Sequence, residues 1–338
     1  MKKIIGIVCL LLMVFNTNAQ FHVLNTFPVS GIAKWDYIQV GPINNWLYIS
    51  HGTQVNIINQ NTGDSVGVIE NTIGVHGIAF DKENAKGFIS NGKLNTVTVF
   101  DMNTNKVLDQ ISTGKDPDAI TYDAFSKKII TCNGHASSLS IIDPVQNKVV
   151  DSVLLDGSPE TAVSDAAGKL FVNIEDKNEI VVIDTKTYKV LHQWSLAPGD
   201  SPTGLSIDKK NKLLFSGCKN MLVVVSAANG KVVDHLPIGK GCDGTAFDPA
   251  TGYVFASCGD GTLTILHKNI DGMIAGKFSV IETVQTKKGA RTLSLDEDTH
   301  RVYLPTAEFE PMQPGQTGRP KAIDGTFQIL EVGVLGKR

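Results

Sequence analysis

The chain lacks the features that identify most enzyme classes and most membrane proteins. It has no C-x-x-C pair, no haem C-x-x-C-H, no G-x-S-x-G or H-E-x-x-H motif and no phosphate-cradling glycine loop, which excludes the most recognisable nucleophile, zinc and nucleotide signatures. Its net charge is only −3, and this mild acidity gives no support to binding of nucleic acid or an anionic membrane. No apolar run reaches the roughly 20 residues of a membrane-spanning helix.

The first 19 residues have the pattern of an export signal. Two lysines precede an apolar run of 12 residues (Ile4 to Phe15), and small residues at Thr17 and Ala19 suit cleavage after position 19. The sequence therefore predicts a signal peptide at 1–19 and one mature domain at 20–338, in the periplasm or secreted. Loss of the two lysines changes the net charge to −5.

Beyond this leader, one unit of about 42 residues recurs along the chain. An apolar run ends in aspartate at Asp81, Asp123, Asp165, Asp208, Asp248 and Asp296, with steps of 42, 42, 43, 40 and 48. A later run ends at Asn59, Asp101, Asp143, Asp184, Ser226, His267 and Glu331, with steps of 42, 42, 41, 42, 41 and 64. This self-similarity indicates a ring or solenoid of small units, none of which can bury its apolar face alone.

Each unit contains four short strand patterns. In the third unit these are DAITYDA, KKIITCNG, SLSIIDP and KVVDSVLL, which are rich in β-branched residues and bounded by turn residues. Four strands at this period predict an all-β fold, a seven-bladed β-propeller with four-stranded antiparallel blades. The seventh unit lacks a fourth strand, so we expect the N-terminal segment from Phe21 to Gly31 to supply it and close the ring.

The units resemble the YVTN-type β-propeller repeat family, a group that includes exported bacterial propellers. The resemblance rests on segments such as DPDAITYDAFSKKIITCNGHASSLSIIDPVQNKVV and SPTGLSIDKKNKLLFSGCKNMLVVVSAANGKVV. It covers nearly the whole mature chain and implies a seven-bladed propeller. It implies no reaction, because propellers include binders, scaffolds and enzymes alike.

Aligning the copies places one residue of each blade where its first strand begins, beside the central channel. These seven positions, called the ring, are Asp36, His76, Asp118, Glu160, Thr203, Asp243 and Arg291. Converging oxygen ligands suit a hard cation such as Ca²⁺. The ring could equally bind a cationic or polyhydroxylated ligand, or form only a hydrated polar funnel.

Histidines extend the possible metal chemistry of this face. The loops that contain His51 and His135 are expected on the same face as His76, although loop histidines are commonly only solvated. Histidine with carboxylates can hold a transition metal, and the possible cofactor is therefore a divalent cation. The candidate ligands are Asp36, Glu160, Asp243, His51, His76 and His135.

The mature chain has four cysteines, and register arguments relate three of them. Centring the turn of the sixth unit on Ala250 places Cys242 opposite Cys258, at a separation that suits a disulfide in an oxidising compartment. A Cys218–Cys242 bridge and buried unbridged thiols are the alternatives. Cys132 is expected opposite Asp118, near the channel mouth.

An insertion at 307–326 in blade seven replaces a short loop. It should emerge beside Arg291, and its cations Arg319 and Lys321 could lie over the acidic ring. Long loops within compact domains are usually functional or disordered. We interpret it as a lid or docking arm, or else as a flexible excursion.

Two functional interpretations follow. The first is an exported, non-enzymatic binding or scaffold propeller that uses the channel-mouth face for a small ligand, a metal or a protein partner, as a monomer. The second is an enzyme that uses the same face: a metal-assisted hydrolase or lactonase, or a quinoprotein-like oxidoreductase. A lactonase would need a carboxylate-bound divalent cation at Asp36, Glu160 and Asp243, with Asp118 or His76 as base.

Overall fold

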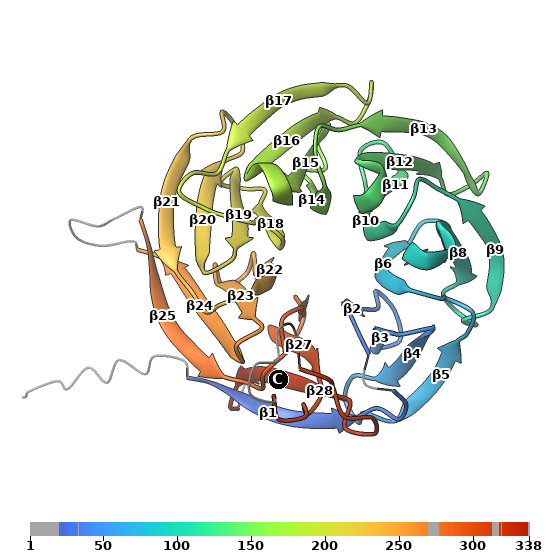
Figure 1. Ribbon diagram of the computed structural model, residues 1–338, viewed down its shortest axis with the longest axis vertical. Helices are drawn as coiled ribbons and strands as arrows, with labels where there is room; N and C mark the ends of the chain where they lie inside the picture. The colour runs from blue at the N-terminus through green and yellow to red at the C-terminus, as the bar shows by residue number, and fades with distance from the viewer. Residues whose placement is uncertain (1–19, 33, 270–276, 313–317, 319, 337–338) are drawn as a thin grey trace, which may run out of the picture.

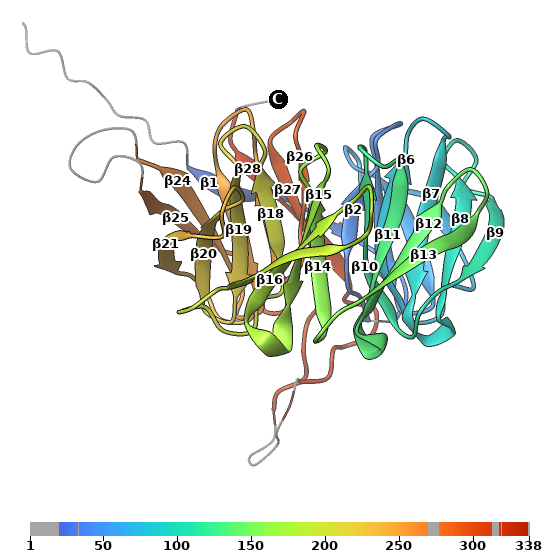
Figure 2. The ribbon, with the colours of Figure 1, turned by 90° about the horizontal axis from the view of Figure 1, so that it is seen from above.

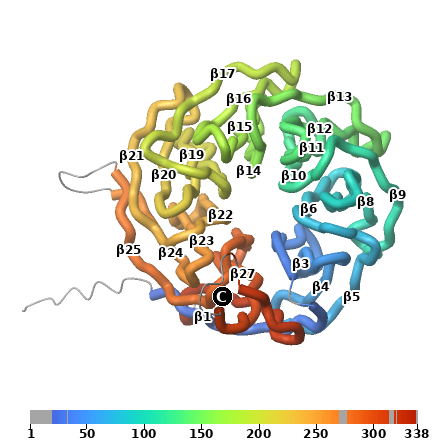
Figure 3. The backbone as a smooth tube through the Cα atoms, in the orientation of Figure 1, coloured from blue at the N-terminus to red at the C-terminus, as the bar shows by residue number. Residues whose placement is uncertain are grey.

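The protein folds into seven blades arranged around a central axis, which confirms the predicted β-propeller (Figure 1). This computed structural model describes residues 20–32, 34–269, 277–312, 318 and 320–336. The predicted signal peptide and Arg319 lie outside the described residues. The chain passes through the blades in sequence order, as the tube in Figure 3 shows.

Each blade is a four-stranded antiparallel sheet, with strand A innermost and strand D outermost. The strands of blades one to three are β2 (Ile38–Val40), β3 (Trp46–His51), β4 (Gln54–Asn59), β5 (Ser65–Ile69), β6 (Val75–Asp81), β7 (Lys86–Asn91), β8 (Thr96–Asp101), β9 (Val107–Ser112), β10 (Pro117–Asp123), β11 (Lys128–Asn133), β12 (Ser138–Asp143) and β13 (Lys148–Leu154). Those of blades four and five are β14 (Pro159–Ser164), β15 (Lys169–Ile174), β16 (Glu179–Asp184), β17 (Val190–Ser195), β18 (Leu205–Asp208), β19 (Leu213–Cys218), β20 (Met221–Ser226) and β21 (Val232–Pro237). Those of blades six and seven are β22 (Cys242–Phe247), β23 (Val254–Cys258), β24 (Thr262–Lys268), β25 (Phe278–Gln285), β26 (Ser294–Asp296), β27 (Arg301–Thr306), β28 (Gln328–Val334) and β1 (Phe21–Pro28).

The N-terminal strand closes the ring, as the sequence predicted. Strand β1 pairs antiparallel with β28, from Phe21 opposite Val334 to Pro28 opposite Gln328. Blade seven is therefore built from both ends of the described chain. This pairing gives blade seven its fourth strand and covers the edge of β28 that would otherwise be unpaired.

The aspartates that mark the repeat are turn residues. Asp248 ends the strand-A segment of blade six, and its carboxylate accepts hydrogen bonds from the backbone amides of Ala250 and Thr251 at 3.0 and 3.4 Å. Asp184 does the same after strand C of blade four, with Lys186 and Thr187 at 2.9 and 2.7 Å. These Asx turns explain why a short carboxylate recurs where two strands connect.

The apolar core lies between neighbouring blades. Phe171 and Val182 of blade four pack in one cluster with Leu214 and Val223 of blade five, and all four are fully buried. A buried Phe or Leu side chain contributes about 2–3 kcal/mol. Each blade therefore depends on its neighbours, as expected for a repeat that cannot bury its own faces.

One face of the disc, here called the mouth face, carries the loops between strands B and C and those between successive blades. Three of these B–C loops contain short 3₁₀ helices: η1 (Gly92–Leu94), η2 (Gly134–Ala136) and η3 (Glu175–Lys177). The long connection between β27 and β28 projects from the same face (Figure 2). In the part of the chain that the structure describes, we find no helix of the length and hydrophobicity that crossing a membrane requires.

Candidate functional site

Local breaks in strand A direct the ring side chains. The pairing of strands A and B shifts between Val75 and Ile78, between Pro117 and Ile120, between Pro159 and Ala162 and between Cys242 and Gly244. The ring residues within these breaks are His76, Asp118, Glu160 and Asp243. A bulge leaves a residue outside the ladder and re-aims its side chain. The other ring residues, Asp36, Thr203 and Arg291, precede strand A of their blades.

Arg291 joins two of the ring carboxylates. Its Nη2 lies 3.0 Å from Asp36 Oδ1, and its Nε lies 2.5 Å from Asp243 Oδ2. The three side chains are each about one fifth to one quarter exposed, at 19%, 19% and 24%. Charge-assisted bonds of this kind are stronger than neutral ones, so Arg291 fixes two carboxylates and neutralises part of their charge.

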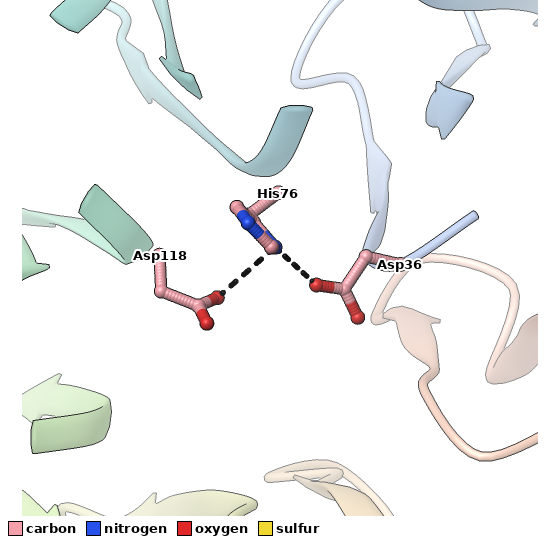
Figure 4. A group of neighbouring side chains, drawn as sticks. All are labelled: Asp36, His76 and Asp118. Carbon is pink, nitrogen blue, oxygen red and sulfur yellow. Dashed lines mark hydrogen bonds and ion pairs between the residues drawn. The ribbon is translucent and has the colours of Figure 1, made fainter. Parts of the chain in front are cut away.

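His76 bridges the same carboxylate and a third one (Figure 4). Its Nδ1 lies 2.6 Å from Asp36 Oδ2 and 3.6 Å from Asp118 Oδ1. The second distance exceeds a hydrogen bond, and this buried Asp118 oxygen has no hydrogen-bond partner among the described residues. One ligand atom from each of the three residues can be chosen so that all lie within 4.8 Å of one another.

The four carboxyl groups of the ring outnumber its two basic side chains, His76 and Arg291. Burial, followed by the charge of Asp118, raises the pKa of Glu160 to about 9. Burial and the charge of Asp36 raise the pKa of Asp118 to about 7. Burial alone would lower the pKa of His76, but its hydrogen bond to Asp36 and the charge of Asp118 outweigh that effect and raise it to about 9. Two carboxyls therefore retain protons that a bound cation would displace.

Hydroxyl groups of neighbouring blades hold the ring backbone in place. Ser257 donates to the carbonyl of Arg291 at 2.5 Å, and Thr292 donates to the carbonyl of Asp36 at 2.5 Å. Thr203, a ring residue itself, donates to the carbonyl of Cys242 at 2.6 Å. The Thr203 hydroxyl thus links blades five and six.

A cavity of about 840 Å³ lies outside the ring on the mouth face. Asp36, His76 and Arg291 form part of its lining, and Asp243 lines a smaller cavity of about 200 Å³ further along the channel. The ring therefore lies where the two cavities meet. The larger volume falls within the range of small-molecule sites. Tyr37, which sequence reasoning missed, follows Asp36 and lines the smaller cavity.

The base of the blade-seven insertion forms one wall of the mouth cavity. Glu310 and Lys321 pair across it, with the Glu310 amide 2.8 Å from the Lys321 carbonyl and their side chains 3.3 Å apart. Phe309 contributes its ring to the cavity lining. The ammonium group of Lys321 is paired with Glu310 within the insertion itself, and the expectation that Lys321 lies over the acidic ring stays a prediction.

The other two candidate histidines differ in their surroundings. His51 is buried, bonds Asn56 Oδ1 at 2.8 Å and the carbonyl of Ile32, and stacks on Phe327. Both imidazole nitrogens of His51 thus bond groups other than the seven ring residues. The geometry does not support His51 as a metal ligand. His135 lines the mouth cavity but pairs with Asp116 at 2.8 Å. Of the six proposed metal ligands, only Asp36 and His76 belong to the close group, which Asp118 completes.

The cysteine register is confirmed, but the structure contains no bridge between these residues. Cys242 lies directly opposite Cys258, and both are buried free thiols, as are Cys132 and Cys218. The hydrogen bond with Cys258, together with burial, raises the pKa of the Cys242 thiol well above its ordinary value. The predicted disulfide is thus replaced by a thiol–thiol contact. Cys132 lies opposite the bulge that contains Asp118, as expected.

Comparisons with known proteins support the architecture. No family model matches the chain, and no curated protein matches it. Among solved structures, hydrazine synthase from Kuenenia stuttgartiensis matches 82% of this chain and 94% of its own chain, with a TM-score of 0.69 and 16% sequence identity. Similarity at this identity establishes the fold alone. The chain is thus a seven-bladed β-propeller, similar in fold to a chain of hydrazine synthase.

Proposed function

We propose that this protein is an exported, non-enzymatic binding propeller of the YVTN-repeat type, acting in the periplasm or outside the cell. Its ring binds a cation, which is either a divalent metal ion or the ammonium group of a small organic ligand. The observation that carries the proposal is the group formed by Asp36, His76 and Asp118, of which Asp36 and His76 line a cavity of ligand size.

Electrostatics support a positive charge in this position. Asp118 and Glu160 have raised pKa values because their charged forms are buried among other carboxylates. A cation beside them would favour the ionised forms and lower both pKa values. Binding should therefore release protons and strengthen as the pH rises from 6 to 8.

The surroundings of His76 favour a binder over a hydrolase of the nucleophilic type. Its described hydrogen-bond and ion-pair partners are Asp36 and Asp118, and among the described residues no hydroxyl or thiol group is hydrogen-bonded to its imidazole. An activated serine or cysteine requires a base within hydrogen-bond reach. The arrangement thus lacks that feature in the described part of the chain.

A metal-assisted hydrolase is the second candidate, and one specific observation favours it. One imidazole nitrogen and two carboxylate oxygens within 4.8 Å of one another could hold a divalent ion. Such an ion would lower the pKa of a bound water and supply a nucleophile. The two candidates share the same site, so metal binding tests both and turnover separates them.

Calorimetric titration of the mature protein tests the proposal. Mn²⁺ and Ca²⁺ form one arm, and putrescine forms the other, each at pH 6 and pH 8. We expect one arm to bind wild-type protein, with at least about tenfold weaker binding to Asp118→Asn. Asp151→Asn, on the outermost strand of blade three, is the matched control and should bind normally.

The outcomes separate the candidates. Binding of metal with no hydrolysis of a panel of lactones and phosphoesters supports the binding propeller, whereas turnover that depends on the metal supports the hydrolase. Absence of binding in both arms, or equal binding by wild type and Asp118→Asn, would refute a cation site at the ring.

A further inference from the structure

The mouth cavity has an outer layer of charge opposite in sign to the acidic ring. Four exposed lysines line it, here called the lysine collar: Lys34, Lys93, Lys240 and Lys288. They lie in the loops before β2, β22 and β26 and in η1, and so belong to blades six, seven, one and two, which follow one another around the central axis (Figure 1). With Arg291, five lysine and arginine side chains line the cavity in a protein of net charge −3.

The carboxylates of the cavity are already engaged by other groups. Asp116 pairs with His135 at 2.8 Å. Asp260 accepts the backbone amide of Lys240 and a threonine hydroxyl, both at 2.7 Å. Asp36, the third carboxylate of the lining, is held by His76 and Arg291 as described above. None of the collar lysines forms an ion pair with a residue that the structure describes, and the lysine and arginine side chains of the lining outnumber its three carboxylates.

An aromatic wall stands within the same cavity. Trp35 and Phe309 line it with ring centroids 6.0 Å apart, and Trp35 also stacks on Phe327 at 5.4 Å. Gly289 permits the close approach of this wall, because a Cβ atom there would lie 2.6 Å from the Phe309 ring and its φ is +84°. The contacts with Phe327 and Gly289 thus hold Trp35 and Phe309 in place.

We propose that the mouth cavity binds an aromatic or otherwise apolar organic anion, whose carboxylate, sulfonate or phosphate group meets the lysine collar while its apolar body lies against Trp35 and Phe309. This inference rests on the use of the mouth cavity for ligands but is independent of a cation at the ring. If both sites are occupied by one molecule, that ligand carries its anionic group outward and its cationic group inward.

Charge and desolvation both favour binding of such an anion in the mouth cavity. Four lysines and Arg291 line the cavity against three carboxylates, so an anion in the cavity meets more attractive than repulsive charges. The apolar wall adds burial of the ligand body and selects against small inorganic anions. Because the collar is exposed, salt should weaken the charge contribution strongly.

Calorimetry with 2-naphthoate tests the inference, with the uncharged 2-naphthalenemethanol as comparison. The test variant is Lys34→Gln, Lys93→Gln, Lys240→Gln and Lys288→Gln together. The control carries the same charge change on turns of the opposite face: Lys209→Gln, Lys210→Gln, Lys212→Gln and Lys231→Gln. We expect the collar variant to bind naphthoate about tenfold more weakly. The control variant should retain wild-type affinity.

Several results would overturn the inference. The first is that the protein binds naphthoate no more tightly than the alcohol. The second is that raising NaCl from 50 to 500 mM leaves the affinity for naphthoate unchanged. The third is that the collar and control variants lose the same amount of affinity. If the fourfold variant does not fold, Lys93→Gln and Lys240→Gln are used singly, each with a loss of about twofold expected. Naphthoate binding without metal or putrescine binding would refute the ring proposal alone.

Discussion

Glu160 offers a direct test of the electrostatics at the ring. In the folded protein burial and the neighbouring carboxylates raise its pKa to about 9, from an ordinary value of 4.5. A raised folded-state pKa means that the folded protein retains a proton which the unfolded chain releases. The stability associated with that proton is fully present below pH 4.5 and is lost progressively as the pH rises to about 9.

Glu160→Gln keeps the shape of the protonated side chain and removes the ionisation. Over three pH units a fully retained proton corresponds to about 4 kcal/mol. Glu160 is not fully buried, and solvent screening reduces the expected effect to about 2 kcal/mol. We therefore expect the variant to be more stable than wild type by about 2 kcal/mol at pH 8, with the difference close to zero at pH 5.

The assay is urea denaturation of the mature protein followed by far-UV circular dichroism at both pH values. Metal-free buffers with chelator are needed, because a bound cation would favour the ionised Glu160 and reduce the difference. Glu297→Gln, an exposed residue in an A–B turn, is the control and should have no pH-dependent effect. If the difference in unfolding free energy between Glu160→Gln and wild type is the same at pH 5 and pH 8, the raised pKa of Glu160 is refuted.

Three further predictions concern the packing and the thiols. Arg291→Met leaves two ring carboxylates without their shared cation and should destabilise the protein by about 2–3 kcal/mol in urea denaturation, whereas Arg291→Lys should recover part of the loss. Gly289→Ala forces a Cβ against Phe309 at positive φ, so we expect a loss of about 2 kcal/mol by thermal denaturation; wild-type stability would contradict the wall geometry. Copper–phenanthroline oxidation should join Cys242 to Cys258 and reduce the four thiols titrated after denaturation to two; four remaining thiols would show that the pair cannot close.

The sequence was sufficient to predict the fold because each repeat is specified by residues close to one another in the chain. Asx-turn aspartates such as Asp184 and Asp248 recur where strands connect, and the β-branched runs between them define the strands. Closure by the segment at Phe21 followed from counting strands. These features depend on neighbours within a few residues, which is why alignment of the copies recovered them.

The candidate site could be predicted only in part. Alignment found Asp36, His76 and Asp118 as equivalent positions of three blades, because each blade contributes one residue where it meets the channel. It could not find the collar lysines, although Lys240 and Lys288 each lie three residues before a ring position. Their shared role depends on which loops surround one cavity, and no single repeat contains that information.

The sequence by itself determined that this chain is a ring of seven four-stranded blades, and it located the channel mouth. Only the tertiary structure decided which side chains there meet. The reason is that the ring residues belong to different blades, and that breaks in the pairing of strand A direct four of them. His51 shows the limit: its position predicted a metal ligand, but its imidazole bonds Asn56 and the carbonyl of Ile32 instead.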